Sequence, residues 1–200
     1  DRGSQATLRL TGRMPAGCRG ERYLAVLEHP VYAASILRTL WQEMGGTWQG
    51  GMRLDTAPDN AAVIATVRSP ELPLIVRDIN KHSNNVMARQ LFLTLGAVTG
   101  GGDVNADTAA QSVAVMARWL AGKGWDWPEL NIDNGAGLSR DARITARHLA
   151  MLLQDAGRGP LAPEFIASLP LVAVDGTMKK RLKNEPLAGQ AHVKTGSLRG

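Results

Sequence analysis

The order of hydrophobic patterns along the chain is the feature that most restricts its fold. Alternating apolar and polar residues at 5–10 and 189–198 predict β-strands near the two ends. Short runs at 52–54 and 61–67 predict two further strands around a turn, and several segments between these strands have helical periodicity. Strands near the ends with helices between them predict a mixed α/β (α+β) domain.

The expected helices follow from the same periodicity and from their cap residues. A helix that starts at Pro30 has proline in its first turn and ends before Gly45. A helix over 72–81 breaks at the sequence HSNN and resumes, with Asn84 or Asn85 as the new N-cap. Further helices are expected at 108–124, at 146–157 after an N-cap at Thr145, at 162–169 and at 176–182, with a short strand at 129–133 and a loop at 98–107.

Composition limits the classes of partner and of site. The formal net charge is +5, and the one tight basic cluster, at 179–183, is interpreted as a solvated helix face. No aromatic residues alternate with these basic residues, so nucleic-acid binding is not expected. No apolar run approaches the ~20 residues that cross a bilayer, Cys18 has no partner for an intrachain disulfide, and the histidines lack metal-ligand spacing. We therefore expect no transmembrane segment, no metal and no organic cofactor.

Two short motifs carry the candidate chemistry. Ser83-x-Asn85 lies at the break between two expected helices, and Lys194-Thr195-Gly196 lies on the expected final strand. A lysine ammonium beside a threonine hydroxyl on a strand edge suits a substrate carboxylate, and glycine allows close approach of the backbone. A serine hydroxyl and an asparagine amide on an opposite wall can pass a proton and hold a substrate carbonyl.

In this order the motifs resemble two of the three signatures of the active-site serine penicillin-recognising enzymes. Three longer segments, at 69–96, 132–153 and 169–182, are similar to segments of the D-alanyl-D-alanine carboxypeptidase/endopeptidase family, the class C low-molecular-mass penicillin-binding proteins. The resemblance implies a β-lactamase/DD-peptidase-like transpeptidase domain, an antiparallel sheet with helices, incomplete at both ends of this chain. Residues 1–20 would then end an inserted accessory domain and its return strand, and 21–200 would be part of the penicillin-binding domain.

The same resemblance implies a function and a location. It implies a serine-type hydrolase that cleaves D-Ala-D-Ala bonds of peptidoglycan stem peptides through an acyl-enzyme, is trapped by β-lactams and acts in the periplasm of the bacterial cell envelope. The implied catalytic residues are Ser83 for proton transfer, Asn85 for contact with the substrate amide and Lys194; the implied substrate-binding residues are Lys194 and Thr195 for the carboxylate, Gly196 for close approach and the Ser197 backbone N–H for the oxyanion.

Two departures from the family pattern affect these expectations. Asn134 and Ala136 replace residues of the family's DGSGLSR segment, which we interpret as a structural turn rather than a rim of the cleft. No serine has lysine at the third following position, so the S-x-x-K nucleophile motif is missing, and Thr177-Met-Lys-Lys180 has only its spacing. We therefore expect this chain to be an internal piece of a longer enzyme and to be inactive alone.

Two alternatives remain open. A class A β-lactamase-like hydrolase predicts a Glu-x-x-x-Asn loop between the two motifs, and the nearest candidate, Glu129-Leu-Asn131, has the wrong spacing. A non-catalytic module that binds peptidoglycan or β-lactams would keep the cleft wall without chemistry.

Overall fold

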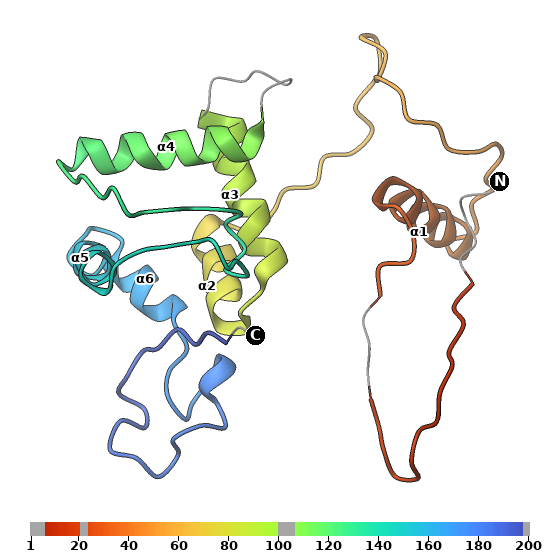
Figure 1. Ribbon diagram of the computed structural model, residues 1–200. Helices are drawn as coiled ribbons and strands as arrows, with labels where there is room; N and C mark the ends of the chain where they lie inside the picture. The colour runs from red at the N-terminus through yellow and green to blue at the C-terminus, as the bar shows by residue number, and fades with distance from the viewer. Residues whose placement is uncertain (1–6, 21–23, 100–106, 198–200) are drawn as a thin grey trace. The chain divides into compact units, whose positions relative to one another are not determined.

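The computed structural model describes residues 7–20, 24–99 and 107–197, which divide into two compact units, Asp1–Thr66 and Val67–Gly200. Regular secondary structure in the described residues is helical (Figure 1), and β pairing there is limited to the isolated bridges Asn131↔Arg143 and Leu171↔His192. In the part of the chain described, no helix is both long and apolar enough to span a bilayer. The domain boundary expected near residue 20 stays a prediction.

The first unit contains α1, His29–Glu43, which confirms the helix expected from Pro30. Proline stands in its first turn, and Gly45, just beyond its end, has a φ of +86°. The indole Nε1 of Trp41 donates a hydrogen bond to the carbonyl of Thr47 at 3.0 Å. This contact turns the chain back along the end of the helix.

The strands predicted for the first unit are not present in the described residues. Residues 5 and 6 lie outside them, and 7–10, 52–54 and 61–67 have no regular secondary structure. An alternating pattern becomes a strand only when a neighbouring strand takes its backbone hydrogen bonds and one face is covered. The side chain of Ile64 is 100% exposed, so this covering is absent there. The antiparallel sheet implied by the resemblance is therefore not confirmed.

The second unit contains the remaining helices. They are α2 (Leu72–His82), α3 (Asn85–Thr99), α4 (Thr108–Gly122), α5 (Ala146–Ala156), α6 (Ala162–Ser168) and the 3₁₀ turn η1 (Gly176–Met178). Asn84 caps α3, since its Oδ1 accepts a hydrogen bond from the Met87 N–H at 3.0 Å. Thr145 caps α5 as predicted, with Oγ1 accepting from the His148 N–H at 3.2 Å.

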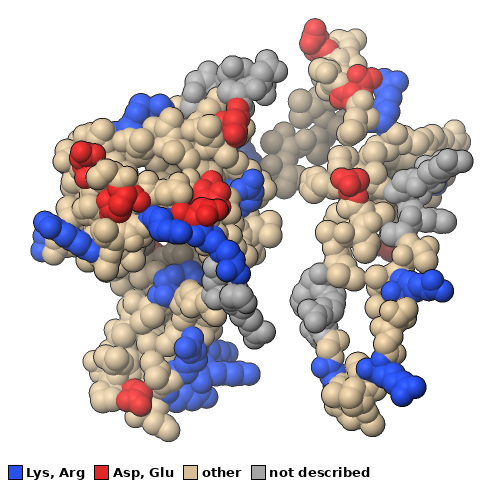
Figure 2. All heavy atoms as spheres, in the orientation of Figure 1, with Lys and Arg blue, Asp and Glu red and all other residues tan. Residues whose placement is uncertain are grey.

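One predicted helix near the end of the chain is wrong in extent. The helix expected at 176–182 is only η1, and Leu182 adopts a φ of +55°, a left-handed conformation that does not continue an α-helix. The basic cluster 179–183 is solvated as predicted but lies on a loop, where Figure 2 shows Lys and Arg side chains gathered.

The predicted strands at 129–133 and 189–198 reduce to single bridges. Residue 131 pairs with Arg143, and His192 pairs with Leu171. Around the second bridge, the Val193 N–H donates to the Pro170 carbonyl at 2.8 Å. Leu198, the last residue of the predicted strand, lies outside the described residues. These contacts still hold the segment with Lys194 against the loop after α6.

Helices α3 and α4 approach closely at Gly96, where α4 crosses α3 (Figure 1). A Cβ on Gly96 would lie 2.3 Å from the Thr108 carbonyl oxygen and 2.4 Å from Ser112 Oγ, so only glycine fits. The fully buried Ser112 hydroxyl accepts from the Gly96 N–H at 3.1 Å and lies 2.6 Å from the Phe92 carbonyl oxygen as a donor. The buried hydroxyl is thus satisfied by the backbone of the neighbouring helix.

An aromatic stack joins the segment after α4 to α5. Trp125 stacks on Trp127 with centroids 4.9 Å apart, and Trp127 stacks on His148 of α5 at 4.7 Å. Oε1 of Glu129 lies 2.5 Å from His148 Nδ1. Trp127 is buried, so this stack is part of the core of the second unit.

Candidate active site

Ser83 lies at the end of α2, in a backbone conformation that is rare for a residue with a side chain. Its φ and ψ are 53° and 48°, the left-handed region, and its N–H donates to the Ile79 carbonyl. Since α3 begins at Asn85, the chain turns sharply here. The predicted break between two helices is therefore confirmed, and Ser83 is its turning residue.

Lys194 reaches Ser83 across the site. Its Nζ donates a hydrogen bond to Ser83 Oγ at 3.0 Å and another to the Thr195 carbonyl at 2.9 Å. Desolvation disfavours the ammonium form and lowers the pKa of Lys194 from its ordinary value of 10.5. An ammonium that donates to a hydroxyl oxygen makes transfer of the hydroxyl proton easier.

The two motifs line one cavity of about 350 Å³. Three segments contribute to its lining. The α2–α3 turn contributes Ser83, Asn84 and Asn85, the final segment contributes Lys194, Thr195, Gly196 and Ser197, and the chain between them contributes residues 135–138. All the site residues predicted from the sequence thus lie on this cavity. A cavity of this volume lies at the lower end of the range of small-molecule sites.

Asn85 holds the third wall of the cavity. Its Nδ2 donates to the Ala136 carbonyl at 2.6 Å, and Arg89 donates to the Asn134 carbonyl at 3.0 Å. A Cβ on Gly135 would lie 2.4 Å from the ring of Phe92, so this loop packs directly on α3. The segment 134–140, for which the sequence predicts a structural turn rather than a rim of the cleft, is held by these hydrogen bonds, and its residues 135–138 also line the cavity.

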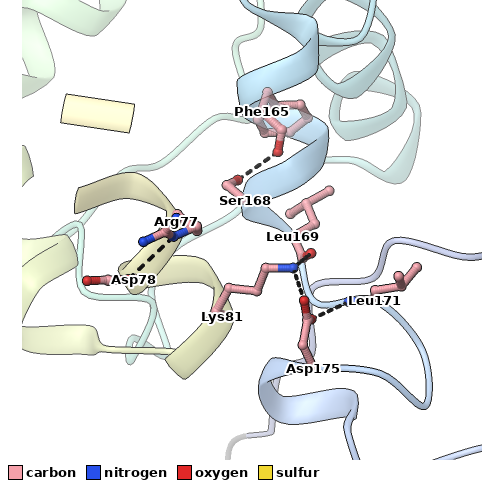
Figure 3. Close-up of polar contacts among 8 residues, drawn as sticks. All are labelled: Arg77, Asp78, Lys81, Phe165, Ser168, Leu169, Leu171 and Asp175. Carbon is pink, nitrogen blue, oxygen red and sulfur yellow. Dashed lines mark hydrogen bonds and ion pairs between the residues drawn. The ribbon is translucent and has the colours of Figure 1, made fainter. Parts of the chain in front are cut away.

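Sequence reasoning missed three polar residues around the site. Thr177 Oγ1 lies 2.9 Å from Thr195 Oγ1, and Lys81 Nζ lies 2.6 Å from Asp175 Oδ2 (Figure 3). The available signal was position: Asp175-Gly-Thr177 falls in a segment that resembles the family, and Lys81 nearly adjoins Ser83. The sequence places Thr177 only in the helix expected at 176–182 and gives no sign of its contact with Thr195.

The Asp175 carboxylate is fixed by several donors. Desolvation raises its pKa, but hydrogen bonds from Lys81 and from the Leu171 N–H outweigh this, and the net effect lowers the pKa of Asp175 from its ordinary value. Its Oδ1 accepts from that N–H at 2.8 Å. The carboxylate therefore stays charged at neutral pH. No group of His, Cys, Asp or Glu within the described ranges is arranged to hold a metal ion.

Comparison with known proteins finds one family and relatives whose names agree with it. The whole chain, residues 1–200, matches the D-Ala-D-Ala carboxypeptidase 3 (S13) family. It is 30% identical over 203 residues to a D-alanyl-D-alanine carboxypeptidase of Actinomadura sp., covering 97% of this chain and 37% of that protein. It is 24% identical over 192 residues to D-alanyl-D-alanine carboxypeptidase DacB of Haemophilus influenzae, covering 92% of this chain and 40% of that protein.

Solved structures show the same fold. The crystal structure of penicillin binding protein 4 (dacB) from Haemophilus influenzae, complexed with a β-lactam, has a TM-score of 0.75 at 24% identity, covering 88% of this chain and 41% of that chain. At this identity the likeness concerns the fold. The chain spans about two-fifths of the length of these relatives.

Proposed function

Because the chain belongs to the D-Ala-D-Ala carboxypeptidase 3 (S13) family, we propose that it supplies part of the active site of a serine-type D-Ala-D-Ala carboxypeptidase/endopeptidase acting on peptidoglycan peptides. The observation that carries this proposal is the 3.0 Å contact between Lys194 Nζ and Ser83 Oγ on one cavity. A hydroxyl and a desolvated ammonium in contact are the groups needed to move a proton beside a bound carboxylate.

The proposed reaction is acyl transfer. A serine oxygen adds to the carbonyl carbon of the penultimate D-Ala, the C–N bond to the terminal D-Ala breaks, and the serine proton passes to the leaving amine; water then hydrolyses the ester. Since no serine of this chain carries lysine at the third following position, we propose that the nucleophile lies in sequence outside these residues. Ser83, polarised by Lys194, relays the proton.

The remaining site residues have binding roles in this proposal. The Lys194 ammonium and the Thr195 hydroxyl bind the terminal carboxylate, and a hydrogen bond to a charged group contributes roughly 1.5–3 kcal/mol. Asn85, already donating to Ala136, contacts the substrate amide with its remaining capacity. The Ser197 N–H serves as an oxyanion donor, and Gly196 lets the substrate approach the backbone.

The proposal extends to ligands and location. A solved relative is described as a complex with a β-lactam. A β-lactam presents a carboxylate near a reactive carbonyl, as the end of a D-Ala-D-Ala peptide does. We therefore propose β-lactams as covalent inhibitors, peptidoglycan stem peptides as substrates, and the periplasm as the location.

The test uses protein expressed from the complete coding sequence. Labelling by a fluorescent penicillin and release of D-Ala from a peptide ending in D-Ala-D-Ala are measured for wild type, Ser83→Ala and Lys194→Ala. Lys194→Ala is expected to lower the second-order rate constant of acylation by roughly 10- to 140-fold, since it removes a charged hydrogen bond. Ser83→Ala is expected to slow acylation with a smaller effect on ground-state binding. Lys183→Ala, in the exposed basic cluster, is the matched control and leaves both rates unchanged.

Other outcomes would contradict this assignment. Unchanged acylation in both site variants would remove Ser83 and Lys194 from the site. Rapid continuous turnover of β-lactams would favour the β-lactamase-like alternative, and reversible binding without a covalent label would favour a non-catalytic module.

A further inference from the structure

Three consecutive residues, Asp175, Gly176 and Thr177, link α2, which leads into Ser83, to the segment that carries Thr195. Asp175 Oδ2 lies 2.6 Å from Lys81 Nζ, near the end of α2 (Figure 3). Gly176, at a φ of +52°, packs so closely there that a Cβ would lie 2.6 Å from the Lys81 carbonyl oxygen. Thr177 Oγ1 then lies 2.9 Å from Thr195 Oγ1. The segment 175–177 therefore braces the helix that ends in Ser83 against the segment that carries Lys194.

On the α2 side, the Lys81 ammonium and both carboxylate oxygens of Asp175 make hydrogen bonds. The Lys81 side chain is only 13% exposed, and its Nζ also donates to the Leu169 carbonyl at 2.7 Å. The second carboxylate oxygen of Asp175 accepts from the Leu171 N–H at 2.8 Å (Figure 3). A partly buried ion pair with these added hydrogen bonds restricts the position of both partners. Thr177 is therefore presented to Thr195 from a fixed backbone.

The contact between the two threonines has two possible directions, and the direction determines whether the Thr195 proton is available to a ligand. A hydroxyl has one proton to donate, so only one proton lies in the 2.9 Å contact. If Thr195 donated to Thr177, it would turn only lone pairs towards a bound carboxylate, which would repel it. If Thr177 donates to Thr195, the Thr195 proton remains free for the carboxylate.

We propose that Thr177 is a positioning residue whose hydroxyl donates to Thr195 Oγ1 and so directs the Thr195 proton to the carboxylate of the ligand. This inference rests on the proposed function, in which Thr195 binds that carboxylate. Thr177 itself need not touch the ligand. The polarised Thr195 hydroxyl is also a stronger donor, because hydrogen bonds in a chain reinforce one another.

The test compares benzylpenicillin, which presents a charged carboxylate, with its methyl ester, in which a neutral methyl ester replaces that carboxylate. Second-order acylation rates are measured on protein from the complete coding sequence for wild type, Thr177→Val and Thr177→Ser. Valine keeps the shape of threonine without the hydroxyl, and we expect it to slow acylation by benzylpenicillin about three- to tenfold, the effect of one neutral hydrogen bond. Acylation by the ester should stay within about twofold, and Thr177→Ser should restore the wild-type rate with benzylpenicillin.

The control and the opposing outcomes separate this inference from the proposed function. Thr94→Val removes an exposed hydroxyl that donates to the Gln90 carbonyl within α3, and it should change neither rate. An equal slowing of both ligands by Thr177→Val, or no slowing of either, would overturn the positioning role while leaving the proposed function standing. A wild-type protein that benzylpenicillin does not acylate would overturn the proposed function, and the inference with it.

Discussion

The close contact of α3 and α4 at Gly96 predicts that Gly96→Ala destabilises the second unit. The added Cβ would lie 2.3 Å from the Thr108 carbonyl oxygen and 2.7 Å from the Ser112 backbone N, and backbone atoms cannot rotate aside. Overpacking of this kind costs about 1–3 kcal/mol. Separating the helices also weakens the hydrogen bonds of Ser112, each contributing about 0.5–1.5 kcal/mol. Alanine gains about 1 kcal/mol of helix propensity over glycine, so the net loss is about 1–3 kcal/mol.

Gly122 provides the matched control for this substitution. It is also a helical glycine, at the end of α4, and a Cβ there would meet nothing within 4 Å among the described residues. Gly122→Ala should therefore stabilise the protein by about 0.4–1 kcal/mol, chiefly by restricting the unfolded chain. The same chemical change is thus expected to have opposite signs at two positions of one helix pair.

Urea unfolding followed by far-UV circular dichroism and tryptophan fluorescence measures both effects. Trp119 and Trp127 report on the surroundings of α4, while circular dichroism reports on the helices together. A lower midpoint for Gly96→Ala with an unchanged slope is the expected result. A Gly96→Ala protein as stable as wild type, or a Gly122→Ala protein equally destabilised, would refute the close-approach argument.

Two further predictions concern charged pairs. Lys81→Met should lower the free energy of unfolding by about 1–2 kcal/mol, which is less than the loss of a fully buried charged hydrogen bond because the Asp175 side chain is 42% exposed. Adding Asp175→Asn to this variant should lower the free energy of unfolding by little more, since the ion pair is already broken. Additive losses in urea unfolding would contradict the pairing. Desolvation raises the pKa of Glu129, but hydrogen bonds from His148 and Thr145 outweigh it and lower the pKa from 4.5 to about 2. The unfolded carboxyl therefore takes up a proton first, so this contribution to stability is present above pH 4.5 and is lost as the pH falls towards 2. Between pH 2 and 4.5 the free energy of unfolding should depend less on pH in Glu129→Gln than in wild type. Identical pH profiles would contradict the contribution assigned to Glu129.

Local signals predicted the helices and the turn at the site. The break between α2 and α3 follows from helical periodicity interrupted by cap residues, and the cap at Thr145 follows from its position before an amphipathic segment. These features depend on neighbours within a few residues, which the sequence displays directly. The helix expected at 176–182 is reduced to η1, and the left-handed backbone of Leu182 is not visible in its periodicity.

Features that depend on distant partners were not predicted by local patterns. The segment 61–67 is a short apolar run of the kind found in strands, but Ile64 is fully exposed, and without a paired strand and a covered face no strand forms there. The contact of Lys194 with Ser83 was expected only because the two motifs resemble those of a known family. The contacts of Thr177 and Lys81 were missed because nothing in their spacing indicates the residues they meet.

The left-handed backbone of Ser83 has a consequence for engineering. The left-handed conformation costs a residue with a Cβ roughly 1–2 kcal/mol more than it costs glycine, which adopts this region freely. A directed-evolution campaign scored on heat resistance alone would be drawn towards glycine at this position. The recovered variants would resist heat but would lack the hydroxyl that accepts the hydrogen bond from Lys194.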